Sequence, residues 1–258
     1  MTPSSPQILV VGDAFVDRYW IGSRRGPSAE FPGDVVDIAE TRDLPGGASN
    51  VAANLRALGA PVYELVGSGP TKNRLITNGV QTARWDENDR CMRLPRRPVG
   101  SFFGVIVSDY NKGAVTSSLI EELTSLDVPI FIDTKRDPWL YRGIKNPTFF
   151  PNLAEWQEFP AYHDYNFPVV RTEGPAGATL VTDPAQDLHL PAFEVPEVRS
   201  VCGAGDTVVA AYAYSYLLQG PWRHEALKFA LAAAAIVVSK PYTSTASLKE
   251  ITDVLRRD

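Results

Sequence analysis

The chain has 258 residues, of which 44% are hydrophobic and 21% charged, values typical of a soluble globular protein with a sizeable core. A formal net charge of −5 argues against a nucleic-acid-binding protein, and the longest apolar run, FALAAAAIVV, is too short to cross a membrane. The two cysteines have no metal-binding spacing and the N-terminus has no secretion-signal pattern, so we expect free thiols and a cytoplasmic protein.

The first expected element is a buried strand. Residues 8–13, ILVVGD, form a continuous apolar run that ends in Gly-Asp, as in a parallel strand that delivers a polar group at its carboxyl end. From residue 15 to residue 45, short β-prone pieces lie between Gly and Pro and predict exposed strands and loops. Residues 46–60 open with two glycines and then carry apolar residues at helical spacing, which predicts a helix.

The rest of the chain alternates between strand and helix patterns. A β-hairpin is expected at residues 71–88, with Asn78-Gly79 at its turn. Further strands are expected at residues 61–67, 102–110, 129–135, 147–150 and 167–172. Helices are expected at residues 117–126, from Pro151 onward, at 207–218 and at 223–239. The alternation predicts an α/β fold, in which a mainly parallel sheet carries helices on both faces.

Several expected strands end in polar residues, and these are candidates for ligand binding. The residues are Asp13, Ser108 with Asp109, Asp133 with Lys135, and Asn152. Ligands of open α/β sheets gather at the carboxyl ends of the strands, so a shared site at this edge is one interpretation. The alternative is that polar residues follow strands because loops are polar.

The stretch VCGAGDT, residues 201–207, precedes a long helical pattern and predicts an anion site. Gly203, Ala204 and Gly205 are small and allow an anion to approach closely, and the backbone amides of residues 204–206 at a helix start would face it. Asp206 would then accept a proton from an attacking hydroxyl while the amides stabilise a transferring phosphoryl group. The alternative for this motif by itself is a tight turn with an acid that caps the helix.

The stretch PNLAE contains a candidate magnesium site. Asn152 and Glu155 are three residues apart, so a helix that starts near Pro151 places both on one face. Amide and carboxylate oxygens suit Mg²⁺, which keeps most of its water ligands. The alternative is a capping box, with Asn152 as the N-cap and Glu155 as its partner.

The stretch GGASN is a candidate sugar site. Gly46 and Gly47 would allow the backbone to approach a polyhydroxylated ligand, and Asn50 and Asp17 would hydrogen-bond its hydroxyl groups. The alternative is an ordinary helix start after two glycines. Four basic residues, candidates for binding a phosphate already on the substrate and otherwise ordinary surface charges, are Arg74, Arg84, Lys112 and Lys135.

Taken in order, these stretches resemble the ribokinase-like (PfkB) family of carbohydrate kinases, and within it the kinases of heptose 7-phosphate. The resemblance runs nearly end to end and is carried by VVGDAFVDRYWIG, TRDLPGGASNVAANLRALGA, VSDYNKGAVT, FIDTKRD, YRGIKNPTFFPNLAEW and LHLPAFEVPEVRSVCGAGDTVVAAYAYSYLLQG. It implies a single three-layer α/β/α kinase domain over residues 1–258, with a small β lid built from residues of about 15–45 and 73–90. It also implies ATP and Mg²⁺ as cofactors, a sugar or sugar phosphate as substrate, and a homodimer.

The resemblance also assigns roles to residues. Asp206 would be the catalytic base, and residues 203–205 the anion hole. The residues implied for the acceptor are Asp17, Gly46, Gly47, Asn50, Arg74, Asp109 and Lys112. Those implied for the nucleotide are Lys135, Asn152, Arg171, Gly174 and Gly177, and those implied for the metal are Asn152 and Glu155.

The chain departs from the family pattern in several places. After Gly69 a strand and a helix of the family are missing, and a helix between Trp156 and Pro168 is shortened. Ser200 and Cys202, just before the glycine-rich turn, replace an acid and a threonine. These departures leave two alternatives open: a family member that binds sugar phosphate or nucleotide without catalysis, and a kinase for a nucleoside or another sugar. A shortened fold would also expose apolar surface, which favours an oligomer.

Overall fold

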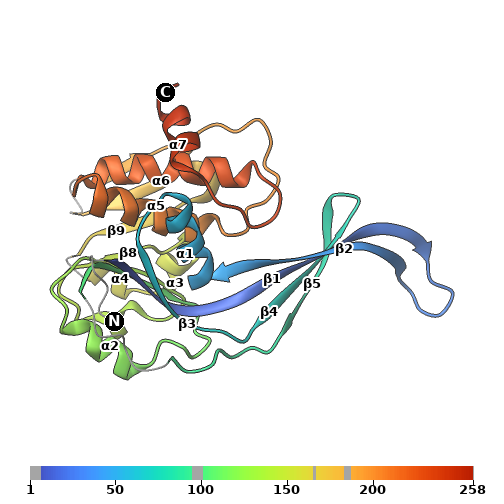
Figure 1. The fold of residues 1–258 in the computed structure, drawn as a ribbon, viewed down its shortest axis with the longest axis horizontal. Helices are drawn as coiled ribbons and strands as arrows, with labels where there is room; N and C mark the ends of the chain where they lie inside the picture. The colour runs from blue at the N-terminus through green and yellow to red at the C-terminus, as the bar shows by residue number, and fades with distance from the viewer. Residues whose placement is uncertain (1–6, 95–100, 165–166, 183–186, 258) are drawn as a thin grey trace.

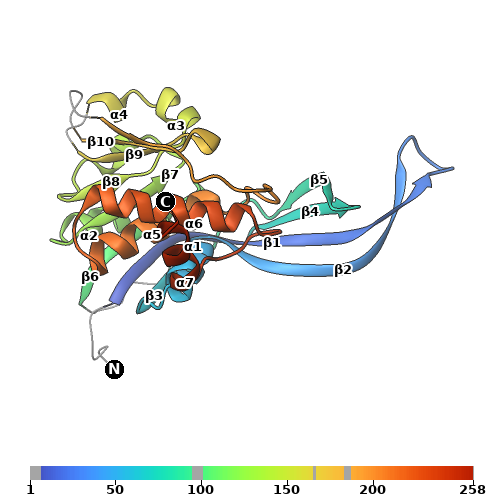
Figure 2. The same cartoon turned by 90° about the horizontal axis from the view of Figure 1, so that it is seen from above.

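The computed structural model describes residues 7–94, 101–164, 167–182 and 187–257. Its strands are β1 (Gln7–Pro27), β2 (Asp34–Gly47), β3 (Val62–Gly67), β4 (Thr71–Thr77), β5 (Val80–Glu87), β6 (Phe102–Asp109), β7 (Ile130–Thr134), β8 (Pro147–Phe149), β9 (Val169–Thr172), β10 (Ala178–Val181) and β11 (Leu188–Leu190). Its α-helices are α1 (Ala48–Ala57), α2 (Ser117–Thr124), α3 (Leu153–Glu158), α4 (Ala161–Asp164), α5 (Ala204–Leu218), α6 (Arg223–Val238) and α7 (Leu248–Leu255). Figures 1 and 2 show a body of helices around a sheet, and a pair of long strands that project from it.

The central sheet is mainly parallel, as the strand–helix alternation predicts. Its strands follow the order β3-β1-β6-β7-β8-β9-β10-β11, and the pairs from β3 to β9 are parallel. Strands β10 and β11 add antiparallel pairs at one edge. The carboxyl ends of the parallel strands therefore meet at one edge of the sheet, where a ligand site is expected.

Two apolar layers cover the faces of this sheet and produce the three-layer architecture. Side chains alternate across a strand, so Ile8 and Val10 face one layer and Leu9 and Val11 face the other. The first layer contains α1, α5, α6 and α7, and the second contains α2, α3 and the residues around Tyr141. The polyalanine run of α6 is buried in the first layer, which agrees with its reading as a core helix.

Strand β1 is longer than the sequence predicts, because it belongs to two sheets. Its first half pairs with β3 and β6 in the central sheet, and from Ala14 onward it pairs with β2 and β4. The expected short strands of residues 15–45 are therefore the distal half of β1 and its partner β2. The β4–β5 hairpin turns at Asn78-Gly79, where both residues have positive φ, as the motif predicts.

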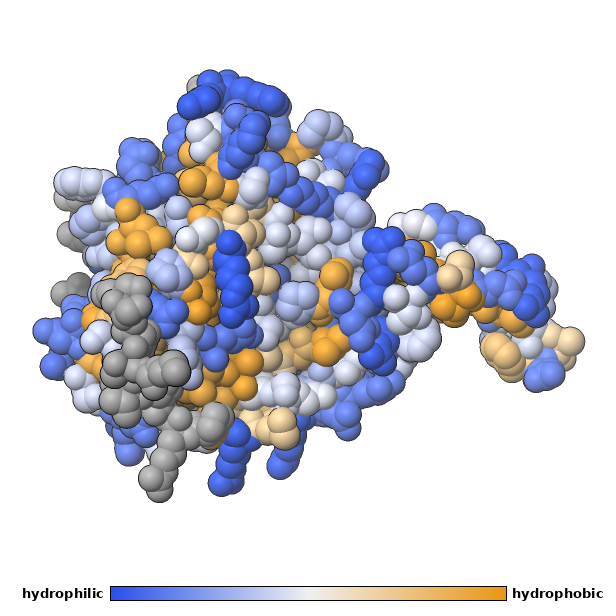
Figure 3. Space-filling view, in the orientation of Figure 1, coloured by the Kyte–Doolittle hydropathy of each residue, from blue (hydrophilic) through white to orange (hydrophobic). Residues whose placement is uncertain are grey.

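The distal parts of β1 and β2 form an arm (residues 18–43) that extends well beyond the body (Figures 1 and 2). In Figure 3 the arm exposes hydrophobic side chains among charged ones. Phe31, near the tip, is 54% exposed, and Ile38 is 44% exposed. The arm thus presents apolar surface that the chain itself does not cover.

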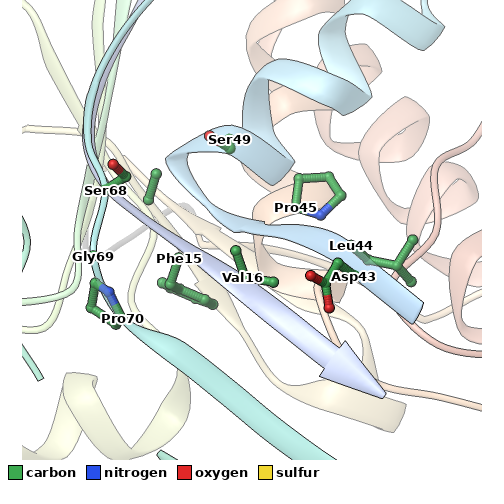
Figure 4. A pocket seen from close by; sticks show the side chains of 10 residues that line it. Phe15, Val16, Asp43, Leu44, Pro45, Ser49, Ser68, Gly69 and Pro70 are labelled. Atoms are coloured by element: carbon green, nitrogen blue, oxygen red, sulfur yellow. The ribbon is translucent and has the colours of Figure 1, made fainter. Parts of the chain in front are cut away.

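The connection from β3 to β4 is only three residues long, at the place where we expect a strand and a helix of the family to be missing. A hollow of about 560 Å³ lies beside this connection, between residues 68–70, residues 43–45 of β2, and Ser49 of α1 (Figure 4). From β1, the side chains of Ala14, Phe15 and Val16 line the hollow.

Both cysteines have free thiols, as expected. Within the described residues, no helix is long and apolar enough to cross a membrane.

Candidate active site

The glycine-rich turn forms an open cradle at the start of α5. Gly203 caps the helix with a φ of +78°, a left-handed conformation that glycine adopts at low energy. A Cβ at this position would lie 2.6 Å from Asn50 Nδ2, so only glycine fits. A Cβ at Gly205 would meet nothing within 4 Å. The first amides of α5 lack partners within the helix, and the open space at Gly205 lets an anion reach them.

Asp206 is buried in the first turn of α5 and accepts hydrogen bonds on both carboxylate oxygens. Asn50 Nδ2 donates to Oδ2 at 2.9 Å, and the Tyr110 hydroxyl donates to Oδ1 at 3.0 Å. Burial raises the pKa of Asp206 to about 7, with a further upward contribution from Asp133. The two hydrogen bonds and Lys135 oppose that rise. A carboxyl group that titrates near neutral pH suits the role of a general base.

Lys135 lies on the side of the site where the nucleotide phosphates are expected. Its ammonium contacts Asp133 Oδ1 at 3.1 Å and Glu155 Oε1 at 2.6 Å. Burial opposes the charge, but the two carboxylates outweigh it and raise the pKa of Lys135. The ammonium also lies 5.5 Å from the centre of the Tyr110 ring, and the hydroxyl of that tyrosine donates to Asp206.

Asn152 and Glu155 form a capping box at the start of α3, which is the alternative to a magnesium site that the sequence leaves open. Asn152 Oδ1 accepts from the Glu155 amide and Glu155 Oε2 accepts from the Asn152 amide, both at 2.9 Å. A role in magnesium binding is compatible with this geometry only in part. Within the described residues, no three His, Cys, Asp or Glu side chains are grouped so that they would hold a metal ion. Glu155 Oε1 also pairs with Lys135, so a role of these two residues in magnesium binding stays a prediction.

Asp17 and Arg74 form a buried ion pair on the acceptor side. Arg74 Nη2 lies 2.9 Å from Asp17 Oδ1, and the side chains are 12% and 4% exposed. Thr243 donates to the other Asp17 oxygen at 3.4 Å. Gly46 is a glycine because its Cβ would lie 2.2 Å from the Phe15 ring. The glycine requirement at Gly46 thus comes from protein packing.

Gly47 has the same explanation, since a Cβ there would lie 2.4 Å from the Asp13 carbonyl oxygen and its φ is +58°. Asn50, from the same motif, donates through Nδ2 to Asp206 Oδ2. The motif therefore connects the acceptor side to Asp206 through Asn50.

Two other residues predicted for the acceptor, Asp109 and Lys112, have side-chain partners of their own, and their role stays a prediction. The Asp109 carboxylate is buried, 2.6 Å from Arg136, and also accepts from Tyr141 and Thr134, so it stabilises the interior. The Lys112 ammonium pairs with Asp89 at the surface. Neither side chain forms a contact with Asp17 or Asp206 within the described residues.

Sequence reasoning missed two residues that face the site, Lys72 and Tyr110. The Lys72 ammonium lies 3.5 Å from the centre of the Phe15 ring and 4.8 Å from that of Tyr110. No described carboxylate forms an ion pair with it, and burial lowers the pKa of Lys72. The available signal was the strand period, because Lys72 and Arg74 lie two apart on β4 and share a face.

The predicted nucleotide residues of β9 and β10 lie at the far edge of the sheet. Arg171 contacts Glu173 at 2.8 Å, and Gly174 has a φ of +58° in the turn that follows. A Cβ at Gly177 would lie 2.1 Å from the Leu190 carbonyl oxygen, so this glycine packs under the segment that follows β11.

That segment borders a groove of about 780 Å³ against α6 and α7. Its lining includes Leu190, Phe193, Glu194, His224, Lys228 and Leu231. The same segment continues to residues 203–206, and on the way the Arg199 amide donates to the Val238 carbonyl at the end of α6. The groove and the cradle are thus joined by one stretch of chain and one helix.

Comparison with known proteins gives a consistent family signal. A model described as pfkB family carbohydrate kinase matches residues 160–250. The bifunctional protein HldE of Aliivibrio fischeri is 32% identical over 317 aligned positions, which cover 99% of this chain and 66% of that protein. The chain thus spans about two thirds of the relative's length. Because the alignment is longer than the 258 residues of the chain, the relative carries segments that this chain lacks.

Solved structures share the fold at low sequence identity. A nucleoside kinase of Methanocaldococcus jannaschii, described as an archaeal member of the ribokinase family, has a TM-score of 0.75 at 13% identity, with 98% of this chain and 99% of that chain covered. Ribokinase of Arabidopsis thaliana complexed with ribose and ATP has a TM-score of 0.73 at 17% identity, with 98% and 99% covered.

Proposed function

Because the chain belongs to the pfkB family of carbohydrate kinases, we propose that it transfers the γ-phosphate of ATP to a hydroxyl group of a sugar or sugar phosphate. The sequence motifs favour a heptose 7-phosphate as the acceptor. One observation carries the proposal: Asp206, at the open mouth of α5, is a buried carboxyl group whose pKa of about 7 suits proton transfer.

The proposed reaction is an in-line displacement. The acceptor hydroxyl gives its proton to Asp206, its oxygen forms a bond to the γ-phosphorus, and the bond from that phosphorus to the bridging oxygen of ADP breaks. The amides of residues 204–206 would donate to the oxygens on which negative charge is spread, although the Ala204 amide also donates to the Val201 carbonyl at 3.3 Å. In the transition state this charge is met by a positive helix end, and no solvent has to reorganise.

Lys135 would support the transferring phosphate from the other side. Its ammonium contacts Glu155 and Asp133, and a phosphate oxygen would share it. Glu155 and Asn152 would hold Mg²⁺ through its water ligands. When bound with ATP, the metal would neutralise part of the charge on the phosphates.

The groove between α6 and the segment after β11 is our candidate for the nucleotide base. Its walls include the apolar side chains of Leu190, Phe193 and Leu231, which suit a flat base, and its polar rim includes Glu194 and Lys228. The chain that forms one wall leads directly to residues 203–206. A nucleotide with its base in the groove would therefore have its phosphates directed along this segment to the cradle.

The acceptor would bind between Asp17, Asn50 and the basic residues of β4. Asp17 accepts hydrogen bonds from sugar hydroxyls on its partly satisfied Oδ2, and Arg74 holds that carboxylate in place. Lys72 adds a positive charge without a carboxylate partner within the described residues, which favours an acceptor that already carries phosphate.

Product identification tests the proposal. The protein is incubated with Mg²⁺, ATP and one acceptor at a time: a heptose 7-phosphate, ribose, fructose 6-phosphate or adenosine. The products are identified by mass spectrometry. We expect a phosphorylated heptose phosphate. Phosphorylation of only adenosine or another sugar would contradict the proposed acceptor but would support the proposed kinase activity. Calorimetric binding of ATP without any product would instead identify a family member that binds and does not catalyse.

We also propose that the protein is a homodimer joined through the arm. Phe31 and Ile38 are exposed there, in a chain whose own body does not cover them. Light scattering of the wild type should give twice the mass of one chain, and Phe31→Asp with Ile38→Asp should give a monomer. The control is Val80→Asp on β5, which is exposed outside the arm and should leave the mass unchanged.

A further inference from the structure

Tyr110 occupies a position in the site that the sequence motifs do not assign. It follows the last residue of β6, and its hydroxyl donates to Asp206 Oδ1 at 3.0 Å. The Phe15 ring packs edge-on against the Tyr110 ring, with centroids 5.0 Å apart. The ammonium groups of Lys72 and Lys135 lie near the same ring, at 4.8 and 5.5 Å from its centre. Tyr110 thus stands between the acceptor side and the phosphate side.

The loop that carries Tyr110 is held rigidly by a carboxylate from the neighbouring strand. Asp13, at the end of the central-sheet part of β1, accepts from the Lys112 amide at 3.0 Å and from the Ala114 amide at 2.8 Å. Asn111 has a positive φ of 58°, and its amide donates to Asp109 Oδ1. These bonds tie residues 110–114 to two strands, which explains what Asp13 and Asp109 do near the site.

We propose that Tyr110 is a positioning residue for the catalytic base, whose hydroxyl fixes the rotation of the Asp206 carboxylate so that a free lone pair faces the acceptor hydroxyl. The argument is geometric. Asn50 fixes one oxygen of the carboxylate and Tyr110 fixes the other, so the group cannot turn about its Cβ–Cγ bond without losing a hydrogen bond. The inference rests on the proposed function, since it assumes that Asp206 takes up the proton.

A donor to the ionised carboxylate also favours its charged form. Burial and the negative charge of Asp206 raise the pKa of Tyr110 well above its usual value, so the phenol stays a donor at neutral pH. The charged and titratable groups that interact with Asp206 are Lys72 on β4, Tyr110 after β6, and Asp133 and Lys135 at and after the end of β7. Of these, Tyr110 and Lys135 lower the pKa of Asp206, and Asp133 raises it.

The test is a pH titration of the ligand-free protein by infrared difference spectroscopy, which follows the buried carboxyl band. Asp206→Asn identifies the band that belongs to Asp206. Tyr110→Phe keeps the ring and removes only the hydroxyl, so the midpoint should rise by about one pH unit. The matched control is Tyr162→Phe, which removes a buried hydroxyl that has no hydrogen-bond partner in the described residues. Its midpoint should equal that of the wild type.

Turnover with a heptose 7-phosphate and Mg²⁺-ATP gives the second readout. In Tyr110→Phe, the acidic limb of kcat should move to higher pH by the same amount, a loss of about tenfold below the midpoint that recovers in alkaline solution. A midpoint and an acidic limb equal to those of the wild type overturn the inference. If Asp206→Asn keeps its turnover, the proposed function fails instead, and the infrared titration still decides whether Tyr110 is coupled to Asp206.

If Tyr110→Phe does not fold, the wild type itself supplies the measurement. With ¹³C-labelled tyrosine, one ring band should shift with the same midpoint as the Asp206 carboxyl band. That coupling is expected because the phenol donates to the carboxylate as it ionises. A tyrosine spectrum that does not change across the Asp206 titration overturns the inference.

Discussion

Replacement of Asp206 by Asn should stabilise the protein, and more so as the pH rises. Burial raises the pKa of this carboxyl group from 3.8 to about 7 in the folded state, so its ionisation opposes folding. The stability that the protonated form contributes is fully present below pH 3.8 and is lost as the pH rises through about 7. Between pH 5 and pH 8 the wild type loses this stability over about two pH units, because the loss ends near pH 7. The free energy of unfolding therefore falls by about 3 kcal/mol, at about 1.4 kcal/mol per unit.

The assay is urea unfolding of the wild type and Asp206→Asn at several pH values, because the difference between the two cancels other titrations. The variant should have the higher free energy of unfolding, and the difference from the wild type should grow by about 3 kcal/mol between pH 5 and pH 8. Asp34→Asn, which removes an exposed carboxylate at the tip of the arm, is the control and should follow the wild type. A difference between wild type and Asp206→Asn that does not change with pH would refute the reasoning.

Three further substitutions test other parts of the site. Gly177→Ala should lower the free energy of unfolding by about 1–3 kcal/mol and weaken ATP binding, measured by urea unfolding and calorimetry, because its Cβ would meet the Leu190 carbonyl oxygen at 2.1 Å. Lys135→Met leaves two buried carboxylates without their cation, so the KM for ATP should rise about tenfold or more in steady-state kinetics. An unchanged KM would show that Lys135 does not bind the phosphates. Asp109→Asn should destabilise by about 3 kcal/mol, since it breaks the pair with Arg136, but should leave the acceptor KM unchanged in the same assays.

Much of the fold was predictable because its signals are local. Apolar runs such as residues 8–13 are long enough to identify buried strands, and Asn78-Gly79 identifies a turn through its positive φ. The length of β1 was not predictable, because its second half pairs with strands that are distant in sequence. Strand continuity of that kind depends on tertiary pairing, which no local pattern encodes.

The geometry of the candidate site was predictable where a local motif sets the backbone position of a residue. Gly203 and Asp206 fall at the start of a helix, and the motif fixes both the turn and the helix. The roles of Asp109 and Gly46 depend on partners such as Arg136 and Phe15, which are remote in the chain. Tyr110 was missed for the same reason, since nothing in the sequence around it indicates that its hydroxyl meets Asp206.

The most direct test of the account compares phosphoryl transfer in the wild type and in Asp206→Asn, with the acceptor that the product screen identifies. The variant is expected to bind Mg²⁺-ATP with a Kd within about twofold of the wild type and to lose about a thousandfold in kcat, since general base catalysis contributes about a hundred- to ten-thousandfold. A variant that transfers phosphate within tenfold of the wild-type rate would contradict the central claim.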